Sequence, residues 1–274
     1  MTDYAYILDK VLHAEIINEP FEYIEITNFL SEEHLNEILN DNQIHFEETI
    51  NENELYKKLL YNDYEIVKFP GCVNNWNDYI NKVNDCNEKS LTKSFGLTFR
   101  LKKYKNENIK RLIEFMNSFE FQNVLKKKFD ITTETSIVTA IQKNLSGYEI
   151  SPHPDIRQKS LTYLLNINKN DDVSNYDVHT HLLEFKSEYK KFEDFWDKNE
   201  QYNRCWVPWE FCNTVKKICK NNSFLIFKPT SKPASLHAVK LDYNHNIFQR
   251  TQIYGNLMYT NCEWSTNLNY DQIE

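Results

Sequence analysis

The sequence predicts an α+β protein in which a sheet-rich core packs against a helical N-terminal layer. The stretches with clear helical spacing of apolar residues fall mainly within about residues 1–130, and strand spacing or short apolar runs prevail over about 131–262. Helices followed by a series of strands are typical of the α+β class. The 274 residues are 41% hydrophobic and 14% aromatic, which is enough for one buried core. We therefore expect a single domain over residues 1–274.

The N-terminal part begins with a short strand that leads into a helix. Residues 23–26 predict the strand, and Ser31 is a favourable N-cap for a helix that runs to about Asn40. Residues 41–105 alternate between polar loops and short apolar pieces. Within them the sequence predicts little beyond a strand at 97–101.

The second half of the chain is predicted to change from helix to sheet. Residues 108–129 have a clear helical pattern with a break near 118–121. An insertion at 169–222 begins as a polar loop and predicts two short helices at 192–201 and 208–220. The predicted strands of the core are 136–142, 148–151, 161–167, 182–185, 223–227, 236–241 and 250–259.

Composition excludes several classes of function. The net charge of −8 argues against nucleic acid or an anionic membrane as the main partner. We expect neither a signal peptide nor a membrane span, since no run of about 18 apolar residues occurs, and we expect a cytoplasmic protein. The six cysteines form no CxxC pair. Cys205, Cys212 and Cys219 recur every seven residues, which predicts one buried helical face rather than a metal or redox site.

The segment around His153 carries the main functional signal. His153 and Asp155 lie two residues apart in a predicted extended segment, so their side chains point to the same side. Pro152 and Pro154 restrict the backbone between them. His237, 82 residues beyond Asp155, could complete a set of two imidazoles and one carboxylate. Such a set leaves half of an octahedron open and is typical of non-haem Fe(II) oxygenases, although an HxD pair alone suits several metals.

Arg250 adds a candidate anion-binding group. It lies 13 residues after His237, across a predicted hairpin. A guanidinium at the start of the returning strand can point into the same cavity and bind a carboxylate through two parallel hydrogen bonds. Arg250 is therefore predicted to hold an anionic co-substrate, and the open face of the metal could take a 2-oxo acid and O2.

These residues resemble a known family, the Fe(II)/2-oxoglutarate-dependent oxygenase superfamily, and in particular its prolyl-4-hydroxylase-like branch. The similarity covers residues of about 20–40 and 108–260. It runs through "NFLSEEHL", the segment from Gly147 to Asp155, "KSLTYLLN", "NSFLIFKPTSKPASLHAV" and "RTQIYG". The order HxD, H and R along the chain is more specific than any single piece.

The resemblance implies a fold, a site and an activity. The implied core is a double-stranded β-helix, or jelly roll, interrupted by the insertion at 169–222. The implied iron ligands are His153, Asp155 and His237, and Arg250 would pair with the distal carboxylate of 2-oxoglutarate. The implied cofactors are Fe(II), 2-oxoglutarate as co-substrate and O2. The implied activity is hydroxylation of a side chain or a small polar metabolite, with release of succinate and CO2.

The sequence departs from this branch at positions around the co-substrate. Tyrosines that are common three and nine residues before the first ligand are replaced by Ile150 and Asn144. A tyrosine that commonly helps to bind 2-oxoglutarate falls on Leu164 or Asn166, and the serine common two residues after the arginine is Gln252. We therefore expect Asn166 or Gln252 to make the second contact to the co-substrate.

Two further features bear on the substrate. His179 and His181 share one strand face and could form a rival metal site or join His153 in a zinc site. We favour the interpretation that His181 lines the substrate side of the cavity. Trp206 belongs to an aromatic cluster at 196–209, which is either structural packing or a lid over the site. Trp206 is the second candidate on the substrate side.

Two other classes of function remain open at this point. A metal-binding jelly-roll protein with isomerase or hydrolase chemistry would lack iron-dependent turnover. A non-catalytic binding module would have lost a metal ligand, and the ligand set here looks complete. A peptide side chain, a free amino acid and a sugar- or lipid-linked metabolite are all compatible substrates, and the sequence does not indicate an oligomeric state.

Overall fold

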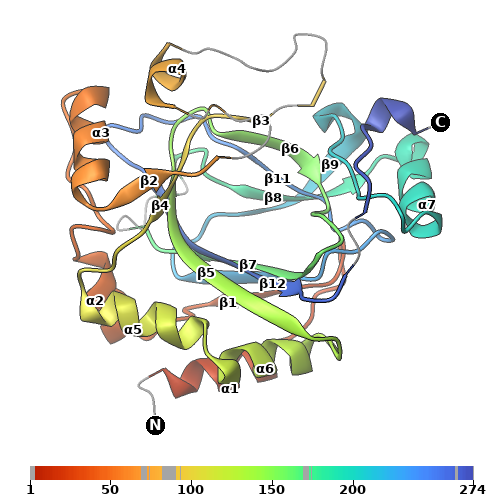
Figure 1. The fold of residues 1–274 in the computed structure, drawn as a ribbon, viewed down its shortest axis with the longest axis horizontal. Coiled ribbons are helices and arrows are strands. Elements are labelled where there is room, and N and C mark those ends of the chain that lie inside the picture. The colour runs from red at the N-terminus through yellow and green to blue at the C-terminus, as the bar shows by residue number, and fades with distance from the viewer. Residues whose placement is uncertain are drawn as a thin grey trace.

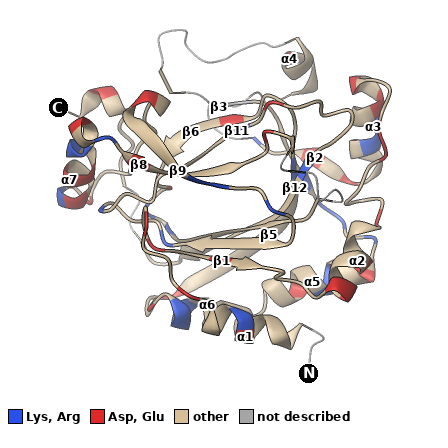
Figure 2. Ribbon diagram, turned by 180° about the vertical axis from the view of Figure 1, so that it is seen from behind, with Lys and Arg blue, Asp and Glu red and all other residues tan. Residues whose placement is uncertain are grey.

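Two antiparallel β-sheets that face each other form the centre of the molecule (Figures 1 and 2). The computed structural model describes residues 4–68, 73, 75–81, 91–92, 94–168, 173, 175–262 and 265–273. Cys72, Cys86 and most of the polar loop predicted at 168–172 lie outside the described residues. The expected combination of helices and antiparallel sheet is confirmed.

The larger sheet has seven strands in the order β1-β10-β7-β12-β5-β4-β2, and the smaller has five in the order β3-β6-β11-β8-β9. Neighbouring strands in both sheets are antiparallel. The strands are β1 (Tyr23–Thr27), β2 (Tyr64–Ile66), β3 (Ser94–Phe95), β4 (Thr98–Leu101), β5 (Thr135–Asn144), β6 (Glu149–His153), β7 (Lys159–Asn166), β8 (Thr180–Phe185), β9 (Cys212–Ile218), β10 (Ser223–Phe227), β11 (His237–Lys240) and β12 (Arg250–Tyr259).

Helices cover the outer face of the larger sheet. Figure 1 shows α1, α2, α5 and α6 together along this face, whereas α3 lies beside β2 and α7 lies at the opposite end of the molecule. The helices are α1 (Ala5–His13), α2 (Glu32–Leu39), α3 (Glu52–Tyr61), α4 (Trp76–Ile80), α5 (Glu107–Met116), α6 (Phe119–Lys128) and α7 (Lys191–Lys198).

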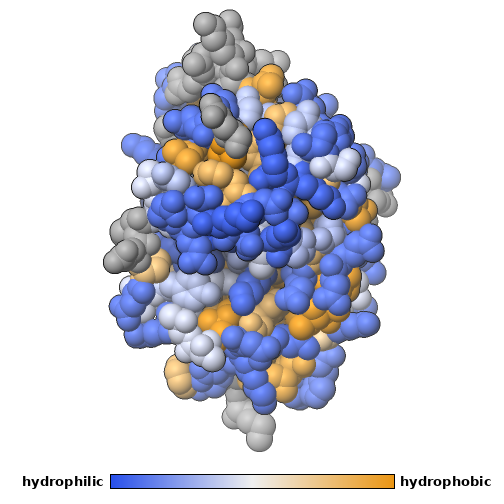
Figure 3. All heavy atoms as spheres, turned by 90° about the vertical axis from the view of Figure 1, so that its right-hand side faces the viewer, coloured by the Kyte–Doolittle hydropathy of each residue, from blue (hydrophilic) through white to orange (hydrophobic). Residues whose placement is uncertain are grey.

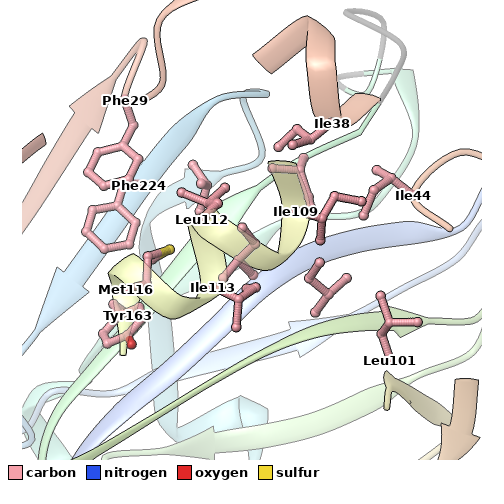
Figure 4. Packing of buried hydrophobic residues seen from close by; sticks show 14 of the residues in the cluster. Phe29, Ile38, Ile44, Leu101, Ile109, Leu112, Ile113, Met116, Tyr163 and Phe224 are labelled. Carbon is pink, nitrogen blue, oxygen red and sulfur yellow. The ribbon is translucent and has the colours of Figure 1, made fainter. Parts of the chain in front are cut away.

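The strands of the larger sheet alternate between the helix layer and the interior between the sheets. On β7, Leu161, Tyr163 and Leu165 pack with the helices, whereas Thr162 and Leu164 line an internal cavity. Figure 4 shows the helix side, where side chains of α5 such as Leu112 and Met116 lie near Tyr163 and Phe224. Successive side chains of a strand point to opposite faces of the sheet, so each strand has one row of side chains toward the helices and one row toward the space between the sheets.

Most elements predicted from the pattern are confirmed. The seven predicted core strands overlap β5, β6, β7, β8, β10, β11 and β12, and the helical stretch at 108–129 breaks into α5 and α6 near Ser118 as expected. The Ser31 hydroxyl caps α2 by accepting a hydrogen bond from the His34 amide. The pattern missed α1, α3, α4, β2 and β3, which are short and lie largely in the polar region that gave few signals.

The helix predicted at 208–220 is wrong. This segment is a single 3-10 turn, Trp209–Phe211, followed by β9, which pairs with β8 at the edge of the smaller sheet. An edge strand has most of its length exposed, so its apolar residues need not alternate, and pairing with β8 overrides the local pattern. The three cysteines therefore share no helical face. Cys205 and Cys212 are buried in one apolar cluster and Cys219 is half-buried against another.

At Gly255, β12 and β7 pack too closely for any larger residue. A Cβ added there would lie 2.1 Å from Cζ of Tyr163, which is opposite Gly255 in the ladder and fully buried. Overpacking a rigid core costs free energy, so Gly255→Ala should lower the free energy of unfolding by about 3 kcal/mol in urea titrations. In a Tyr163→Leu background the same change should cost less than half as much. An equal cost in both backgrounds would contradict this contact.

The buried Lys143 should make the free energy of unfolding depend on pH. Its ammonium is buried on β5, where it donates to the Ile44 carbonyl and the Thr251 hydroxyl, and burial lowers its pKa to about 7. Between this value and the ordinary lysine pKa of about 10.4, the unfolded chain binds the proton and the folded chain does not. Stability should therefore rise with pH above about 7, and Lys143→Met should flatten that slope. Urea midpoints measured at several pH values up to pH 9.5 test this, and parallel slopes would refute it.

Charged side chains lie mainly on the helices and loops. Figure 2 shows most acidic and basic residues on the outer helices, with the strands largely uncharged, and Figure 3 shows a mostly hydrophilic face interrupted by smaller hydrophobic areas. No helix in the described part of the chain has the length and apolar character needed to cross a bilayer. Apart from histidines, the charged residues that are buried in the described part of the chain are Lys143, Asp155, Arg204 and Arg250, and the last three line the internal cavity.

Candidate metal centre

Two histidines from neighbouring strands meet between the sheets. His153 ends β6 and His237 begins β11, and the two residues are direct partners in the ladder. Their ring centroids are 4.4 Å apart. Asp155 follows two residues after β6, with carboxylate oxygens 3.8 Å from His153 Nε2 and 3.7 Å from His237 Nε2. One ligand atom from each of the three residues lies within 4.8 Å of the others, so this group can hold a metal ion.

A turn, rather than the strand itself, positions Asp155. The sequence predicted that Asp155 lies in the same extended segment as His153, but β6 ends at His153 and Asp155 has a φ of 60°. Aspartate tolerates this left-handed conformation better than most residues. Its carbonyl accepts a hydrogen bond from Nε of Arg204 at 3.1 Å. The chain therefore turns sharply after Pro154, and this turn brings the carboxylate back toward the two imidazoles.

Both imidazoles are held with Nε2 free to bind a metal. Nδ1 of His153 lies 2.8 Å from the Ser151 carbonyl, and Nδ1 of His237 lies 3.1 Å from the Ser235 carbonyl. A carbonyl oxygen only accepts, so each Nδ1 carries the proton and each Nε2 keeps its lone pair. A backbone partner on the second ring nitrogen is the usual way in which proteins orient metal-binding histidines.

The electrostatic environment favours the protonation states that ligands need. Burial, together with the neighbouring His237, lowers the pKa of His153 to about 3, and burial lowers the pKa of His237 as well. Burial alone would raise the pKa of the Asp155 carboxyl, but the Lys159 ammonium and the two imidazoles lower it well below its usual range. At neutral pH the site therefore offers two neutral imidazoles and one carboxylate.

Side chains of β7 fix the Asp155 carboxylate. The Lys159 ammonium contacts Oδ1 at 2.6 Å, and the Thr162 hydroxyl donates to Oδ2 at 2.7 Å. Lys159 also donates to the Tyr254 hydroxyl at 3.1 Å. Each carboxylate oxygen has two acceptor sites, so these contacts leave room for a metal on either oxygen. The carboxylate is thus oriented by partners on two sides before any metal binds.

The three ligands open onto a cavity of about 400 Å³ between the sheets. Its lining is mostly apolar, and the charged members are three cations and one carboxylate. The lining residues are Gln142, Tyr148, Ile150, His153, Asp155, Ile156, Lys159, Thr162, Leu164, Thr180, Arg204, Trp206, His237, Ala238, Val239, Arg250, Gln252 and Tyr254. A concave apolar site with a few convergent polar groups is the usual form of a small-molecule pocket.

Arg250 lies at the start of β12, faces this cavity and is 2% exposed. Its Nε donates to the Val178 carbonyl at 2.9 Å, and its two terminal nitrogens donate to Asn144 Oδ1 at 3.0 Å and to the Thr180 hydroxyl at 2.7 Å. These bonds use three of the five N–H donors of a guanidinium. Burial lowers the pKa of Arg250 to about 10, so it remains charged at neutral pH. Among the described residues no carboxylate contacts it.

The other predicted site residues have different placements. Trp206 lines the cavity, with its ring 6.0 Å from that of His153. Gln252 also lines it and donates to Asn166 Oδ1 at 2.7 Å, whereas Asn166 is not part of the lining. Gln252 Oε1 is buried and has no hydrogen-bond partner among the described residues. This oxygen is an acceptor, so only a donor such as a water molecule could satisfy it.

His181 does not reach the cavity, contrary to the prediction. Thr180 lines the cavity, and His181, the next residue of β8, faces the other side of the sheet, as the period of two requires. There its ring contacts the Thr214 hydroxyl at 3.1 Å and packs edge-on against Trp209. His179 pairs with Asp177, and neither histidine joins the metal-binding group.

The sequence did not predict several residues of the cavity, among them two cations and two tyrosines. Lys159, Arg204, Tyr148 and Tyr254 all face the cavity. Lys159 had a usable signal, because it is the one charged residue of a strand that is otherwise uncharged and buried. Arg204 had none, since it lies in an irregular segment between α7 and β9 that reaches the site only through the tertiary fold.

Comparisons with known proteins give a limited result. No family model matches the chain, and no curated protein matches it. A prolyl-4-hydroxylase of Pseudomonas putida aligns over 94% of this chain and 100% of its own, with a TM-score of 0.45 and 8% identity. A prolyl hydroxylase of Trichoplax adhaerens, in complex with a peptide fragment of the hypoxia inducible factor oxygen degradation domain, aligns over 93% and 89%, with a TM-score of 0.45 and 11% identity. Values this low do not assign a family or a function.

Proposed function

We propose that the chain is a non-haem Fe(II)- and 2-oxoglutarate-dependent dioxygenase that hydroxylates a side chain or a small polar metabolite and releases succinate and CO2. One observation carries the proposal. A single cavity holds a complete set of two histidines and one carboxylate together with a buried arginine, Arg250, that contacts no carboxylate among the described residues. We further propose that the two sheets form a double-stranded β-helix and that residues 1–274 are one domain.

The donor set fits ferrous iron. His153, Asp155 and His237 would hold the ion on one face, and the cavity side would remain open. Two neutral nitrogens and one carboxylate oxygen are the ligands that non-haem Fe(II) oxygenases use. When bound, the iron together with 2-oxoglutarate and O2 supplies an oxidation that no side chain of the cavity can perform.

Arg250 would bind the distal carboxylate of 2-oxoglutarate. Its bonds to Val178, Asn144 and Thr180 fix the plane of the guanidinium and leave one N–H on each terminal nitrogen. Two such donors match the two oxygens of a carboxylate. Asn144, which departs from the tyrosine common in the resembled branch, would thus orient the arginine rather than contact the co-substrate.

Gln252 is the better candidate for the second contact to the co-substrate. It lines the cavity, and Asn166 does not. The amide nitrogen of Gln252 has two N–H groups and donates one of them to Asn166. The other would be available to an acceptor in the cavity. Asn166 would then act by holding the Gln252 amide in place.

The apolar lining would limit access of water to the reacting centre. Ile150, Leu164 and Val239 belong to this lining, and Trp206 lies beside His153. Fewer waters around the site strengthen its electrostatic interactions and reduce side reactions. The protein thus contributes placement of the co-substrate and exclusion of solvent.

Uncoupled turnover tests the proposed function. Purified protein incubated with Fe(II), 2-oxoglutarate and air should form succinate slowly, and omission of any one of the three should stop it. Chromatography with mass detection measures the product. Succinate formation that is independent of iron, or its absence under every condition together with no binding of Fe(II), would reject the proposal.

A further inference from the structure

Arg204 is a second buried arginine that lines the cavity. Its terminal nitrogens contact neither the metal-binding residues nor the partners of Arg250. The residue lines the cavity and is 7% exposed. Its Nε donates to the Asp155 carbonyl at 3.1 Å, which uses one of its five N–H donors. Neither terminal nitrogen has a hydrogen-bond partner among the described residues. Its four remaining N–H donors are therefore available to a ligand in the cavity, where a charge-assisted hydrogen bond is stronger than in bulk water.

The charges of the cavity indicate the sign of that ligand. Three cations, Lys159, Arg204 and Arg250, line it against one carboxylate, Asp155. A ferrous ion would add two positive charges, and 2-oxoglutarate, a dianion, would remove two. The excess of two positive charges would therefore remain after the metal and the co-substrate bind. Lys159 is already paired with Asp155, which leaves Arg204 as the cation without an acidic partner of its own.

Arg204 and Arg250 belong to different parts of the cavity. Arg204 comes from the segment between α7 and β9 and is bonded to the backbone of a metal ligand. Arg250 comes from β12 and is bonded to Val178, Asn144 and Thr180. The two guanidinium groups share no hydrogen-bond partner. The two groups are therefore held by separate sets of contacts, and the terminal donors of Arg204 are available to a ligand other than the one at Arg250.

We infer that the substrate of this oxygenase carries an oxyanion, a carboxylate or a phosphate, that binds the terminal nitrogens of Arg204, and this inference rests on the proposed function. Trp206, two residues further along, lines the same cavity beside His153 and would contact an apolar part of the substrate. The anion would fix one end of the substrate, and the carbon to be hydroxylated would lie toward the metal. Trp206 and Arg204 come from the aromatic segment at 196–209, which would thereby contribute to specificity.

A purely positioning role for Arg204 predicts different behaviour. If its only task were to hold the Asp155 turn, Arg204→Gln would weaken metal binding and would leave anion binding to the loaded protein unchanged. Arg157 provides a matched control. It also donates hydrogen bonds to this segment, to the Trp196 and Tyr202 carbonyls, but it does not line the cavity. Arg157→Gln should therefore perturb the segment and leave the cavity charge intact.

Calorimetric titrations with a matched pair of probes test the inference. The protein is loaded anaerobically with Fe(II) and saturated with 2-oxoglutarate, and is then titrated with benzoate, with neutral benzamide and with inorganic phosphate. At least one of the two anions should bind about tenfold or more tightly than benzamide, as expected for a charge-assisted contact. Arg204→Gln should abolish that preference, and Arg157→Gln should retain it.

The outcomes separate the alternatives. Preference for benzoate assigns a carboxylate, and preference for phosphate alone assigns a phosphate. Equal binding of all three probes, a preference that survives Arg204→Gln, or anion binding only in competition with 2-oxoglutarate would overturn the inference. The preceding titration with 2-oxoglutarate reports separately on the proposed function. If 2-oxoglutarate does not bind, the same probes are titrated into the Fe(II)-loaded protein, and the effect of Arg204→Gln still shows whether Arg204 binds an anion.

Discussion

Replacing either His153 or His237 with alanine is expected to abolish metal binding. Each imidazole would supply one of the three protein ligands of the metal, together with the Asp155 carboxylate. Removal of one imidazole leaves only two ligands. Loss of a partner that merely orients a ligand already costs about 10- to 100-fold in metal affinity, so loss of a ligand should cost more than about 100-fold. Anaerobic titration with Fe(II) or Co(II) measures this affinity directly. Succinate formation should disappear in parallel.

His181→Ala is the matched control for these two variants. His181 lies on β8 directly beside β11 but faces the opposite side of the sheet, against Thr214 and Trp209. It should therefore keep the metal affinity of the unmodified protein. Loss of metal in His181→Ala, with retention in His153→Ala, would move the metal site to the rival histidine pair.

Arg250→Gln is expected to raise the requirement for 2-oxoglutarate by about 100-fold, as typical for loss of a buried charge partner. The physical reason is that the distal carboxylate would enter a low-dielectric cavity without its paired donors. Initial rates of succinate formation measured over a range of 2-oxoglutarate concentrations give the effect. Metal affinity should change little, because Arg250 contacts none of the three ligands.

Thr180→Val tests whether the orientation of Arg250 affects binding of 2-oxoglutarate. It keeps the shape of the side chain but removes the hydroxyl that accepts from Arg250 at 2.7 Å. It should raise the 2-oxoglutarate requirement by less than Arg250→Gln does, and thermal melting should show that both variants fold. An unchanged requirement in folded Arg250→Gln would remove the arginine from the co-substrate site.

The sequence predicted the fold best where burial dictates the pattern. The strands β5, β7, β10 and β12 are buried in the larger sheet, so their apolar runs and alternation are strong signals. The edge strand β9 has few buried residues, and pairing with β8 decides its conformation. Local periodicity therefore gave a helix there. Long-range pairing of this kind is not visible in one segment.

Some residues of the candidate site could likewise be predicted from local sequence, and others could not. His153 and Asp155 stand out as a histidine and a carboxylate two residues apart beside prolines, and Arg250 stands out as the one charged residue of its strand. The turn at Asp155, with its positive φ, was not predicted, since the proline-flanked segment indicates extended backbone on both sides. Arg204 could not be predicted, because an irregular segment of the chain has no periodicity that fixes the direction of a side chain. Its placement depends on where α7 and β9 bring the segment.

An anaerobic titration of the protein with Fe(II) and 2-oxoglutarate tests the central claim most directly. A bidentate 2-oxo acid on ferrous iron gives a weak visible charge-transfer band, which should appear with one equivalent of each component. His237→Ala should show no band, and Arg250→Gln should show it only at much higher 2-oxoglutarate. A protein that binds Fe(II) but gives no band at saturating 2-oxoglutarate, or a band that persists in His237→Ala, would contradict the proposed site.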